Sequence, residues 1–168
     1  MDKVCKPFIY PTPYKLHFSN SYKEGYKTDL AGVCKTLSGV DKDLAAHITV
    51  INKVGITLCG QGICDVFEPI PKQFYIDSIL YDIENADEEI TEEPVYFILN
   101  LCRVLAYLQD YLVLSKKQGG EWGVKNLPAI YSKLIQNALE CYSGNSDFTE
   151  TDLIFSFAKF CKNCATKN

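Results

Sequence analysis

The stretch from Pro94 to Leu108 reads PVYFILNLCRVLAYL and is apolar on almost every side of a helical wheel. Proline is tolerated in the first turn of a helix. We therefore expect a helix that begins near Thr91–Pro94 and runs through Val95–Leu108. A helix that is apolar all round must be covered by neighbours on all sides. The stretch predicts the central helix of a helical bundle.

Apolar residues at helical spacing predict further helices on both sides of this segment. Before it, one apolar face comprises Ile76, Ile79, Leu80 and Ile83. After it, a helix that starts at Pro128 presents Tyr131, Leu134, Ile135, Ala138, Leu139 and Tyr142. A last helix, with Thr149 as its expected cap, has a stripe of Leu153, Phe157, Phe160, Cys161 and Cys164. The expected fold class is mainly α, with a C-terminal bundle of about four to five helices.

A smaller mixed part precedes the bundle. The alternation of Lys15–Phe18 and the apolar run Ile56–Gly60 each predict a short strand. Between them, apolar residues at helical spacing predict one helix over residues 44–54. Two prolines then interrupt regular structure in Phe67–Pro71. We place the boundary between a small α+β region and the bundle immediately before Pro71.

Composition and charge exclude several classes of protein. The chain has 168 residues, 47% of them hydrophobic and 23% charged, which excludes disorder and fits one domain or two small lobes. The net charge of −4 argues against a nucleic-acid coat, so we expect no nucleic-acid partner. No apolar run reaches the length of a membrane span, and the N-terminus lacks a signal-peptide core. Eight cysteines beside an ample core indicate reduced thiols and a cytoplasmic protein.

Two motifs could bind metal but have a simpler explanation. Cys161 and Cys164 form the only CxxC, whereas structural zinc needs four ligands, so core packing is favoured over metal or redox use. Asp41 and Asp43 form an Asp-x-Asp of the kind that binds magnesium on a strand. They lead directly into a helix, where acidic residues cap free N–H groups. Helix capping is therefore the favoured interpretation.

An acidic run precedes the central helix without any Lys or Arg between its members. It comprises Asp82, Glu84, Asp87, Glu88, Glu89, Glu92 and Glu93. Such a run is either a solvated loop before a helix start or an electronegative wall for a polycationic ligand. Glu89 and Glu93 are four residues apart, so they point the same way if the helix extends back to Glu89.

The segment Ser115–Gly123 separates the central helix from the one that starts at Pro128. Lys116 and Lys117 lie beside glycines, at the start of a helix after Ser115, where a lysine can approach a phosphate. No complete phosphate-loop motif is present, and Trp122 is expected to be a packed anchor rather than a stacking platform. The two histidines form no recognisable nucleophile triad, which argues against hydrolase chemistry.

Several stretches resemble the aminoglycoside adenylyltransferases that modify streptomycin and spectinomycin. They are Tyr10–Ser19, Asp41–His47, Phe97–Tyr107 and Leu114–Pro128, within a match over residues 7–143. The resemblance implies a nucleotidyltransferase lobe followed by a helical bundle, with ATP and drug in the cleft between them. Residues 1–70 would then be the tail of the first lobe, and residues 71–168 the substrate-binding helical domain.

The same resemblance implies roles for four side chains. Lys116 matches a family lysine that contacts the ATP phosphates. Glu93 matches a carboxylate that holds the cationic groups of the drug, and Glu89 falls on another acid used in drug binding. Tyr96 falls where some members carry a histidine in the drug pocket. The implied ligands are ATP and an aminoglycoside or a similar polycationic small molecule.

The chain also departs from the family pattern. The family's Gly-Ser element, metal-binding Asp-x-Asp and general-base Glu all fall before the stretch that aligns with Met1. A tryptophan used against streptomycin would lie near Ser21 or Tyr22, where this chain has none. We therefore expect no catalytic and no metal-binding residue in this chain. ATP and magnesium are cofactors of the complete family enzyme, and neither is expected to be bound by this chain alone.

Three functions remain open from the sequence. The first is the drug-binding part of an ATP-dependent aminoglycoside nucleotidyltransferase. The second is a catalytically inert binding module that captures a polycation or a protein partner, and the third is a structural remnant without a ligand. An exposed cleft face would also favour a homodimer, because large apolar patches seldom stay uncovered.

Overall fold

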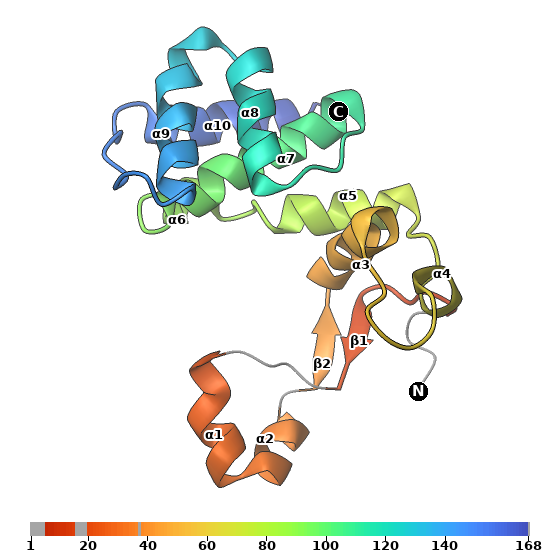
Figure 1. The fold of residues 1–168 in the computed structure, drawn as a ribbon. Helices are drawn as coiled ribbons and strands as arrows, with labels where there is room; N and C mark the ends of the chain where they lie inside the picture. Colours follow the sequence, from red (N-terminus) through yellow and green to blue (C-terminus); the bar gives the residue numbers. More distant parts are fainter. Residues whose placement is uncertain (1–5, 16–19, 37, 168) are drawn as a thin grey trace. The chain divides into compact units, whose positions relative to one another are not determined.

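The computed structural model describes residues 6–15, 20–36 and 38–167, and the chain divides into two compact units, 1–78 and 79–168. Figure 1 shows helices throughout and one small sheet, which confirms the mainly helical fold predicted from the sequence. The junction of the units falls inside helix α5 (Lys72–Tyr81). The domain assignment of residues 1–70 and 71–168 stays a prediction.

The first unit combines a two-stranded sheet with short helices. Strands β1 (Thr12–Tyr14) and β2 (Gly39–Asp41) pair antiparallel, with Thr12 opposite Asp41. The other elements of this unit that precede α5 are η1 (Asn20–Tyr22), α1 (Lys23–Thr28), α2 (Leu30–Thr36), α3 (Asp43–Val54) and α4 (Ile63–Val66). The predicted helix over residues 44–54 is confirmed by α3.

Helix α3 is attached to the part of α5 that belongs to the first unit. Its Ala45 and Ile48 are buried, and the Ala46 N–H donates to the buried Ser78 hydroxyl at 3.1 Å. Tyr10 stacks on Phe74 of α5, with ring centroids 4.6 Å apart. These contacts give the unit a small core of helix, aromatic rings and sheet.

The buried strand predicted for Ile56–Gly60 is wrong. This run is irregular, and the side chains of Ile56 and Leu58 are 82% and 95% exposed. A strand needs a hydrogen-bonded neighbour, and the described sheet pairs β1 with β2 only. The strand predicted for Lys15–Phe18 lies, after its first residue, outside the described residues.

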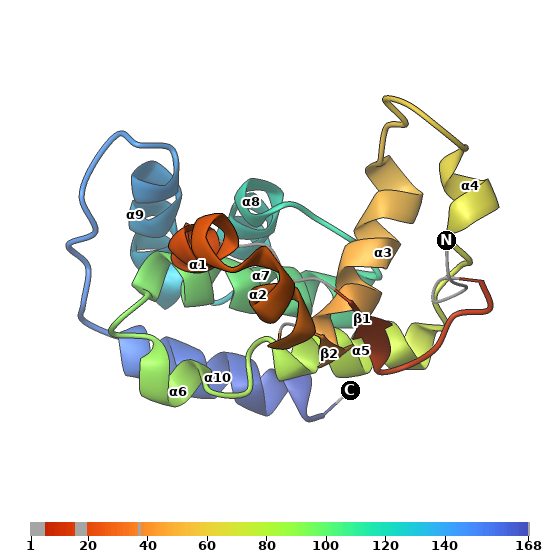
Figure 2. The same ribbon diagram turned by 90° about the horizontal axis from the view of Figure 1, so that it is seen from below.

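The second unit is a helical bundle around α7 (Pro94–Asp110). The other elements are α6 (Ala86–Glu89), α8 (Lys116–Asn126), η2 (Ala129–Tyr131), α9 (Ser132–Tyr142) and α10 (Ile154–Ala165). Helix α7 packs against α8, α9 and α10, and its residues 97–102 are all buried. The central helix predicted from the sequence is confirmed. Figure 2 shows α10 running beside α6, in agreement with the contacts between them.

Residues 116–126 form a full helix rather than a glycine-rich connection. Ser115 caps it by accepting from the Gln118 N–H at 3.2 Å, and the Gln118 side chain accepts in return from the Ser115 N–H at 3.0 Å. A Cβ added at Gly120 would lie 2.6 Å from Leu139 and 2.7 Å from Leu99. The glycines of α8 therefore let its backbone approach α7 and α9.

The last helix begins later than predicted. Thr149 is not its cap, because α10 starts at Ile154 after Leu153, which has a left-handed φ of 66°. The N–H groups of Thr149 and Glu150 donate instead to the Asn137 carboxamide oxygen on α9, at 2.9 and 3.1 Å. These two bonds attach the connection between α9 and α10 to α9, and α10 begins only after that connection.

In the part of the chain that the structure describes, none of the helices combines the length and the hydropathy that crossing a bilayer requires.

Candidate functional site

A polar stripe interrupts the apolar surface of α7. Tyr96, Asn100 and Arg103 are spaced i, i+4 and i+7, so they share one face of the helix. Tyr96 and Arg103 are half-buried, whereas Asn100 is only 2% exposed. A buried amide in a bundle core is costly unless its hydrogen bonds are satisfied. The partners of this stripe define the candidate site.

Asp82 accepts hydrogen bonds from the first two residues of the stripe. The Tyr96 hydroxyl donates to Asp82 Oδ1 at 2.5 Å, and Asn100 Nδ2 donates to Oδ2 at 2.9 Å. Both carboxylate oxygens of Asp82 therefore have a partner within the unit. Asp82 follows α5 directly and is the first residue of the acidic run. The two hydrogen bonds therefore attach the start of that run to α7.

The Asn100 amide extends the same network to Arg103. Arg103 Nη1 donates to Asn100 Oδ1 at 3.0 Å, and Arg103 Nε donates to the Leu114 carbonyl at 2.9 Å. Leu114 lies in the connection between α7 and α8. A continuous chain of hydrogen bonds thus runs from Asp82 to the residues that precede α8.

Lys116 is the first residue of α8, and its position depends on α7. Its Nζ lies 4.0 Å from the centroid of the Tyr96 ring, within the range of a cation–π contact. A Cβ added at Gly119, one turn further along, would lie 2.5 Å from Arg103 Cγ. The missing side chain at Gly119 therefore allows the start of α8 to approach Arg103.

The environment of Lys116 is partly desolvated and mixed in charge. Burial lowers the pKa of the Lys116 ammonium below its usual value, and the charge of Arg103 lowers it further. The carboxylates of Asp82 and Glu93 act in the opposite direction on the same pKa. Two cations beside the N-terminus of an 11-residue helix suit an anionic group such as a phosphate.

The two acids predicted to bind drug lie in different elements. Glu89 is the last residue of α6, is exposed, and accepts from Asn85 Nδ2 at 3.3 Å. Glu93 is also exposed and immediately precedes α7. Because α7 begins at Pro94, Glu89 and Glu93 do not share one continuous helix. Of the predicted site residues, the structure brings Tyr96 and Lys116 into contact and leaves Glu93 close enough to influence the lysine.

The sequence assigned no site role to Asp82, Asn100 or Arg103. Asn100 and Arg103 were part of the stretch Phe97–Tyr107 that carries the family resemblance, and Asp82 was one acid of the acidic run. The signal that could have found the network is the polar stripe itself, since Asn100 interrupts a helix that is otherwise buried in the bundle.

The Asp-x-Asp in the first unit lies where β2 leads into α3. Asp41 Oδ1 accepts from the Asp43 N–H at 2.8 Å, and Asp43 lies in the first turn of α3. The aspartates therefore serve the helix start, as predicted. Among the described residues, no three carboxylate, thiol or imidazole groups come together as a metal site.

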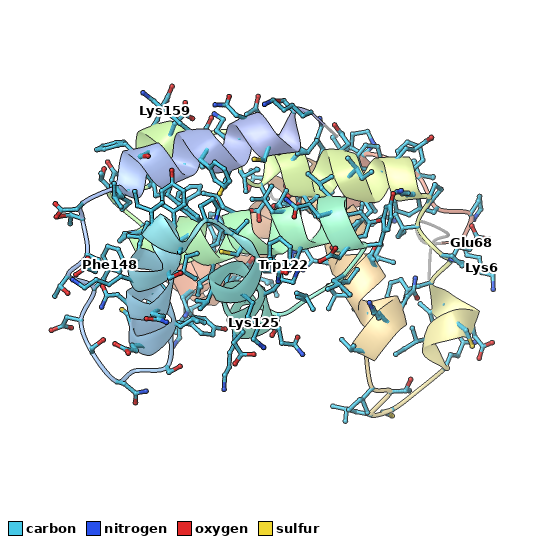
Figure 3. The ribbon with its side chains drawn as sticks, turned by 90° about the horizontal axis from the view of Figure 1, so that it is seen from above. Lys6, Glu68, Trp122, Lys125, Phe148 and Lys159 are labelled. Carbon is cyan, nitrogen blue, oxygen red and sulfur yellow. The ribbon has the colours of Figure 1, made fainter. Side chains whose placement is uncertain are left out.

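Trp122 and Cys161 are core residues. Trp122 is 8% exposed, and its Nε1 donates to Asp110 Oδ2 at 2.7 Å, which confirms the packed anchor. Figure 3 shows Trp122 among the helices of the bundle, whereas the exposed Lys125 projects from the same helix. Cys161 is fully buried, and the cysteines whose side chains are described are free thiols.

The helical unit is thus a bundle whose central helix, α7, carries one polar stripe. Residues 65–164, more than half of the chain, match the family "Aminoglycoside adenylyltransferase, C-terminal domain", and the chain belongs to the aminoglycoside adenylyltransferase family.

Curated relatives and a solved structure agree with this family. An aminoglycoside (3'') (9) adenylyltransferase of Klebsiella pneumoniae is 25% identical over 166 residues, which cover 96% of this chain and 62% of the relative. One of Rhizobium radiobacter is 24% identical over 162 residues, 93% of this chain and 58% of the relative. The chain thus spans less than two thirds of the length of these relatives.

The solved structure shows a similar fold. The spectinomycin adenyltransferase AAD(9) from Enterococcus faecialis, crystallised with ATP and spectinomycin, superposes with a TM-score of 0.78 at 15% identity. The superposition covers 95% of this chain and 63% of that one.

Proposed function

We propose that this chain is the drug- and nucleotide-binding C-terminal part of an ATP-dependent aminoglycoside adenylyltransferase. The observation that carries the proposal is Lys116, held over the Tyr96 ring beside Arg103 at the start of α8. Its support is the family membership together with relatives described as adenylyltransferases.

The nucleotide side of the proposed site is cationic. Lys116 is a compact point charge, and Arg103 holds its guanidinium in place through Asn100 and Leu114. Burial makes the lysine ammonium costly in the absence of an anion. A phosphate group would relieve the repulsion between the two cations and would also meet the N–H groups of the first turn of α8.

The drug side of the proposed site is acidic. Glu89 and Glu93 are exposed carboxylates on successive turns before α7, where ammonium or guanidinium groups of an aminoglycoside could reach them. In the proposed reaction a drug hydroxyl attacks the α-phosphorus of ATP, its proton passes to a base, and pyrophosphate leaves. Magnesium, where bound, neutralises charge on the phosphates. The residues of this chain bind and orient the two reactants.

The proposal also includes the cellular location of the protein and its partners. ATP use favours a cytoplasmic protein, and the net charge of −4 favours neither nucleic acid nor an anionic membrane as partner. The homodimer expected from the sequence would appear in sedimentation equilibrium as twice the mass of the chain.

Calorimetric titration with ATP tests the proposal on this chain completed by the nucleotidyltransferase lobe of a family member, with Lys117→Ala as the matched control for Lys116→Ala. Lys117 is the exposed neighbour with the same charge and helix propensity. We expect Lys116→Ala to weaken ATP binding by about 10-fold or more, the range of a charge-assisted contact, and Lys117→Ala to change it little. Equal losses in both variants, or no ATP binding to the unsubstituted protein in that completed form, would refute the proposal. Spectinomycin binding without ATP binding would favour the inert binding module instead.

A further inference from the structure

We infer that Asp82 and Tyr96 are positioning residues for Lys116: the Asp82 carboxylate holds the Tyr96 hydroxyl, and the Tyr96 ring holds the Lys116 ammonium at the start of α8. This inference rests on the proposed function for its biological meaning. Its geometry stands independently of that function, because the three side chains belong to one compact unit.

The first step is the orientation of the ring. Tyr96 lies in the first turn of α7, where a tyrosine that is half-buried could adopt more than one rotamer. Its hydroxyl donates to Asp82 at 2.5 Å, and the carboxylate is held on its other oxygen by the buried Asn100. The tyrosine is therefore anchored at its far end to a group that cannot move without breaking a second buried hydrogen bond.

The second step is the effect of that anchor on the lysine. The Lys116 ammonium lies 4.0 Å from the ring centroid and so meets the negative face of the aromatic system. A phenol that donates to a carboxylate is more electron-rich than a free phenol, which strengthens the attraction for a cation. Lysine has four rotatable bonds, and a contact of this kind selects one orientation of the ammonium before a ligand arrives.

The third step concerns the availability of the carboxylate. Both oxygens of the half-buried Asp82 already accept hydrogen bonds, one from Tyr96 and one from Asn100. Glu93, by contrast, is exposed. The acidic run thus contains Asp82, which orients the ring beside the lysine, Asp87, which pairs with Lys162, and glutamates that are exposed.

Nuclear magnetic resonance of the lysine side chain tests the inference on the complete 168-residue chain. With lysine labelled with ¹³C at Cε, the Lys116 signal is the one that disappears in Lys116→Ala. We expect its Hε protons to be shifted upfield by the ring current of Tyr96, and Tyr96→Leu to abolish the shift. In Asp82→Asn and in Tyr96→Phe, which keep the ring but weaken or remove its anchor, we expect the shift to decrease.

The matched control is Asp110→Asn. Asp110 is also a carboxylate that accepts from an aromatic side chain of this unit, Trp122, but Trp122 is not the ring in contact with Lys116. We expect it to leave the Lys116 signal unchanged. Tyr96→Phe keeps the test decisive if Asp82→Asn fails to fold, because it leaves the bond between Asp82 and Asn100 in place.

A second readout connects the positioning to ATP. We expect Asp82→Asn and Tyr96→Phe to weaken ATP binding by roughly 2- to 10-fold, the range that a cation–π contact spans. An unchanged Lys116 signal in both variants would overturn the inference. If the protein completed by the nucleotidyltransferase lobe binds no ATP, the proposed function fails, and the Lys116 signal of the 168-residue chain still decides whether Asp82 and Tyr96 position the lysine.

Discussion

The Glu93 N–H donates to the Glu89 carbonyl at 3.2 Å, although the two residues belong to different elements. Glu89 ends α6, and a turn over residues 90–93 leads into α7. The turn continues a helical hydrogen-bonding pattern across the break and buries Ile90 completely. The two carboxylates therefore lie on successive turns of the backbone, as the proposed drug wall requires, without a shared helix.

The first prediction concerns this wall. We expect Glu93→Gln to lower the affinity for spectinomycin or streptomycin by about 1.5- to 5-fold, since an exposed ion pair contributes roughly 0.2–1 kcal/mol. The loss should become smaller at high salt, because salt screens exposed charges. Calorimetry at two ionic strengths measures both effects. The control is Glu92→Gln, at an exposed neighbouring residue of equal charge. Identical effects of the two variants would show that the acidic run is a solvated helix start and not a binding surface.

The second prediction concerns the packing of α8. We expect Gly120→Ala to destabilise the chain by about 1–3 kcal/mol, because the new Cβ would lie 2.6–2.7 Å from Leu139 and Leu99. In an exposed helix the same change stabilises by about 0.5–1 kcal/mol, so the sign of the effect reports the close approach. Urea unfolding measures it, with the exposed Lys125→Ala as control. A more stable Gly120→Ala variant would show that α8 packs more loosely.

Periodicity predicted the bundle well because its helices bury one face or all faces. Helix α7 is apolar on all sides except its polar stripe, and α9 has a clear apolar stripe, so both could be predicted from spacing alone. The strand at Ile56–Gly60 could not be judged from spacing, because a strand depends on a partner that the run itself does not specify. The late start of α10 also depends on a distant residue, Asn137.

The sequence predicted only part of the candidate site. Lys116 was identified because it matches a family lysine and follows Ser115 at an expected helix start. The bond between Asp82 and Tyr96 joins residues 14 positions apart that belong to different elements. No local pattern specifies such a pair. The glycines of α8 suggested a phosphate loop, whereas the structure uses them for contact with α7 and α9.

The third prediction concerns the pH dependence of stability. Lys162 of α10 donates to the Asp87 carboxylate and to the Glu84 carbonyl, and its hydrogen bond holds the pKa of Asp87 below its usual range. The folded state therefore binds fewer protons at Asp87 than the unfolded state does. The contribution of Asp87 to the free energy of unfolding is therefore complete above the pKa of an unfolded aspartate, about 3.9. It is lost as the pH falls through the lower pKa that Asp87 has in the folded chain.

The variant Asp87→Asn should accordingly be less stable than the unsubstituted chain by at most about 1 kcal/mol at pH 7, since the pair is partly exposed. The difference should shrink below pH 4. Urea unfolding between pH 3 and pH 7 measures it, and Glu88→Gln, at an exposed neighbouring position, serves as control. A difference that persists unchanged at pH 3 would mean that Asp87 acts through packing and not through its charge.

The fourth prediction concerns thiol reactivity. Burial raises the pKa of Cys102 to about 12 and that of Cys161 well above its usual value, whereas Cys59 and Cys64 are exposed. A thiol with a pKa near 12 has roughly a thousandfold less thiolate at pH 8 than an ordinary cysteine. We expect iodoacetamide to modify Cys59 and Cys64 in the folded chain and Cys102 and Cys161 only in urea. Peptide mass spectrometry measures the rates, and rapid labelling of Cys161 in the folded chain would contradict its place in the core.

The last prediction concerns catalysis by this chain alone. Nucleotidyl transfer requires paired carboxylates for magnesium, a base for the drug hydroxyl and a cradle for the triphosphate. The only Asp-x-Asp of the sequence serves the start of α3, where Asp41 accepts the Asp43 N–H. Asp41 ends β2 and Asp43 begins α3, so the two carboxylates belong to different elements. We therefore expect the purified chain, mixed with ATP, magnesium and spectinomycin or streptomycin, to release no pyrophosphate above background in a coupled assay. Turnover that is lost in Asp43→Asn but kept in Asp65→Asn, an exposed aspartate of the same unit, would show that Asp41 and Asp43 form a metal site after all.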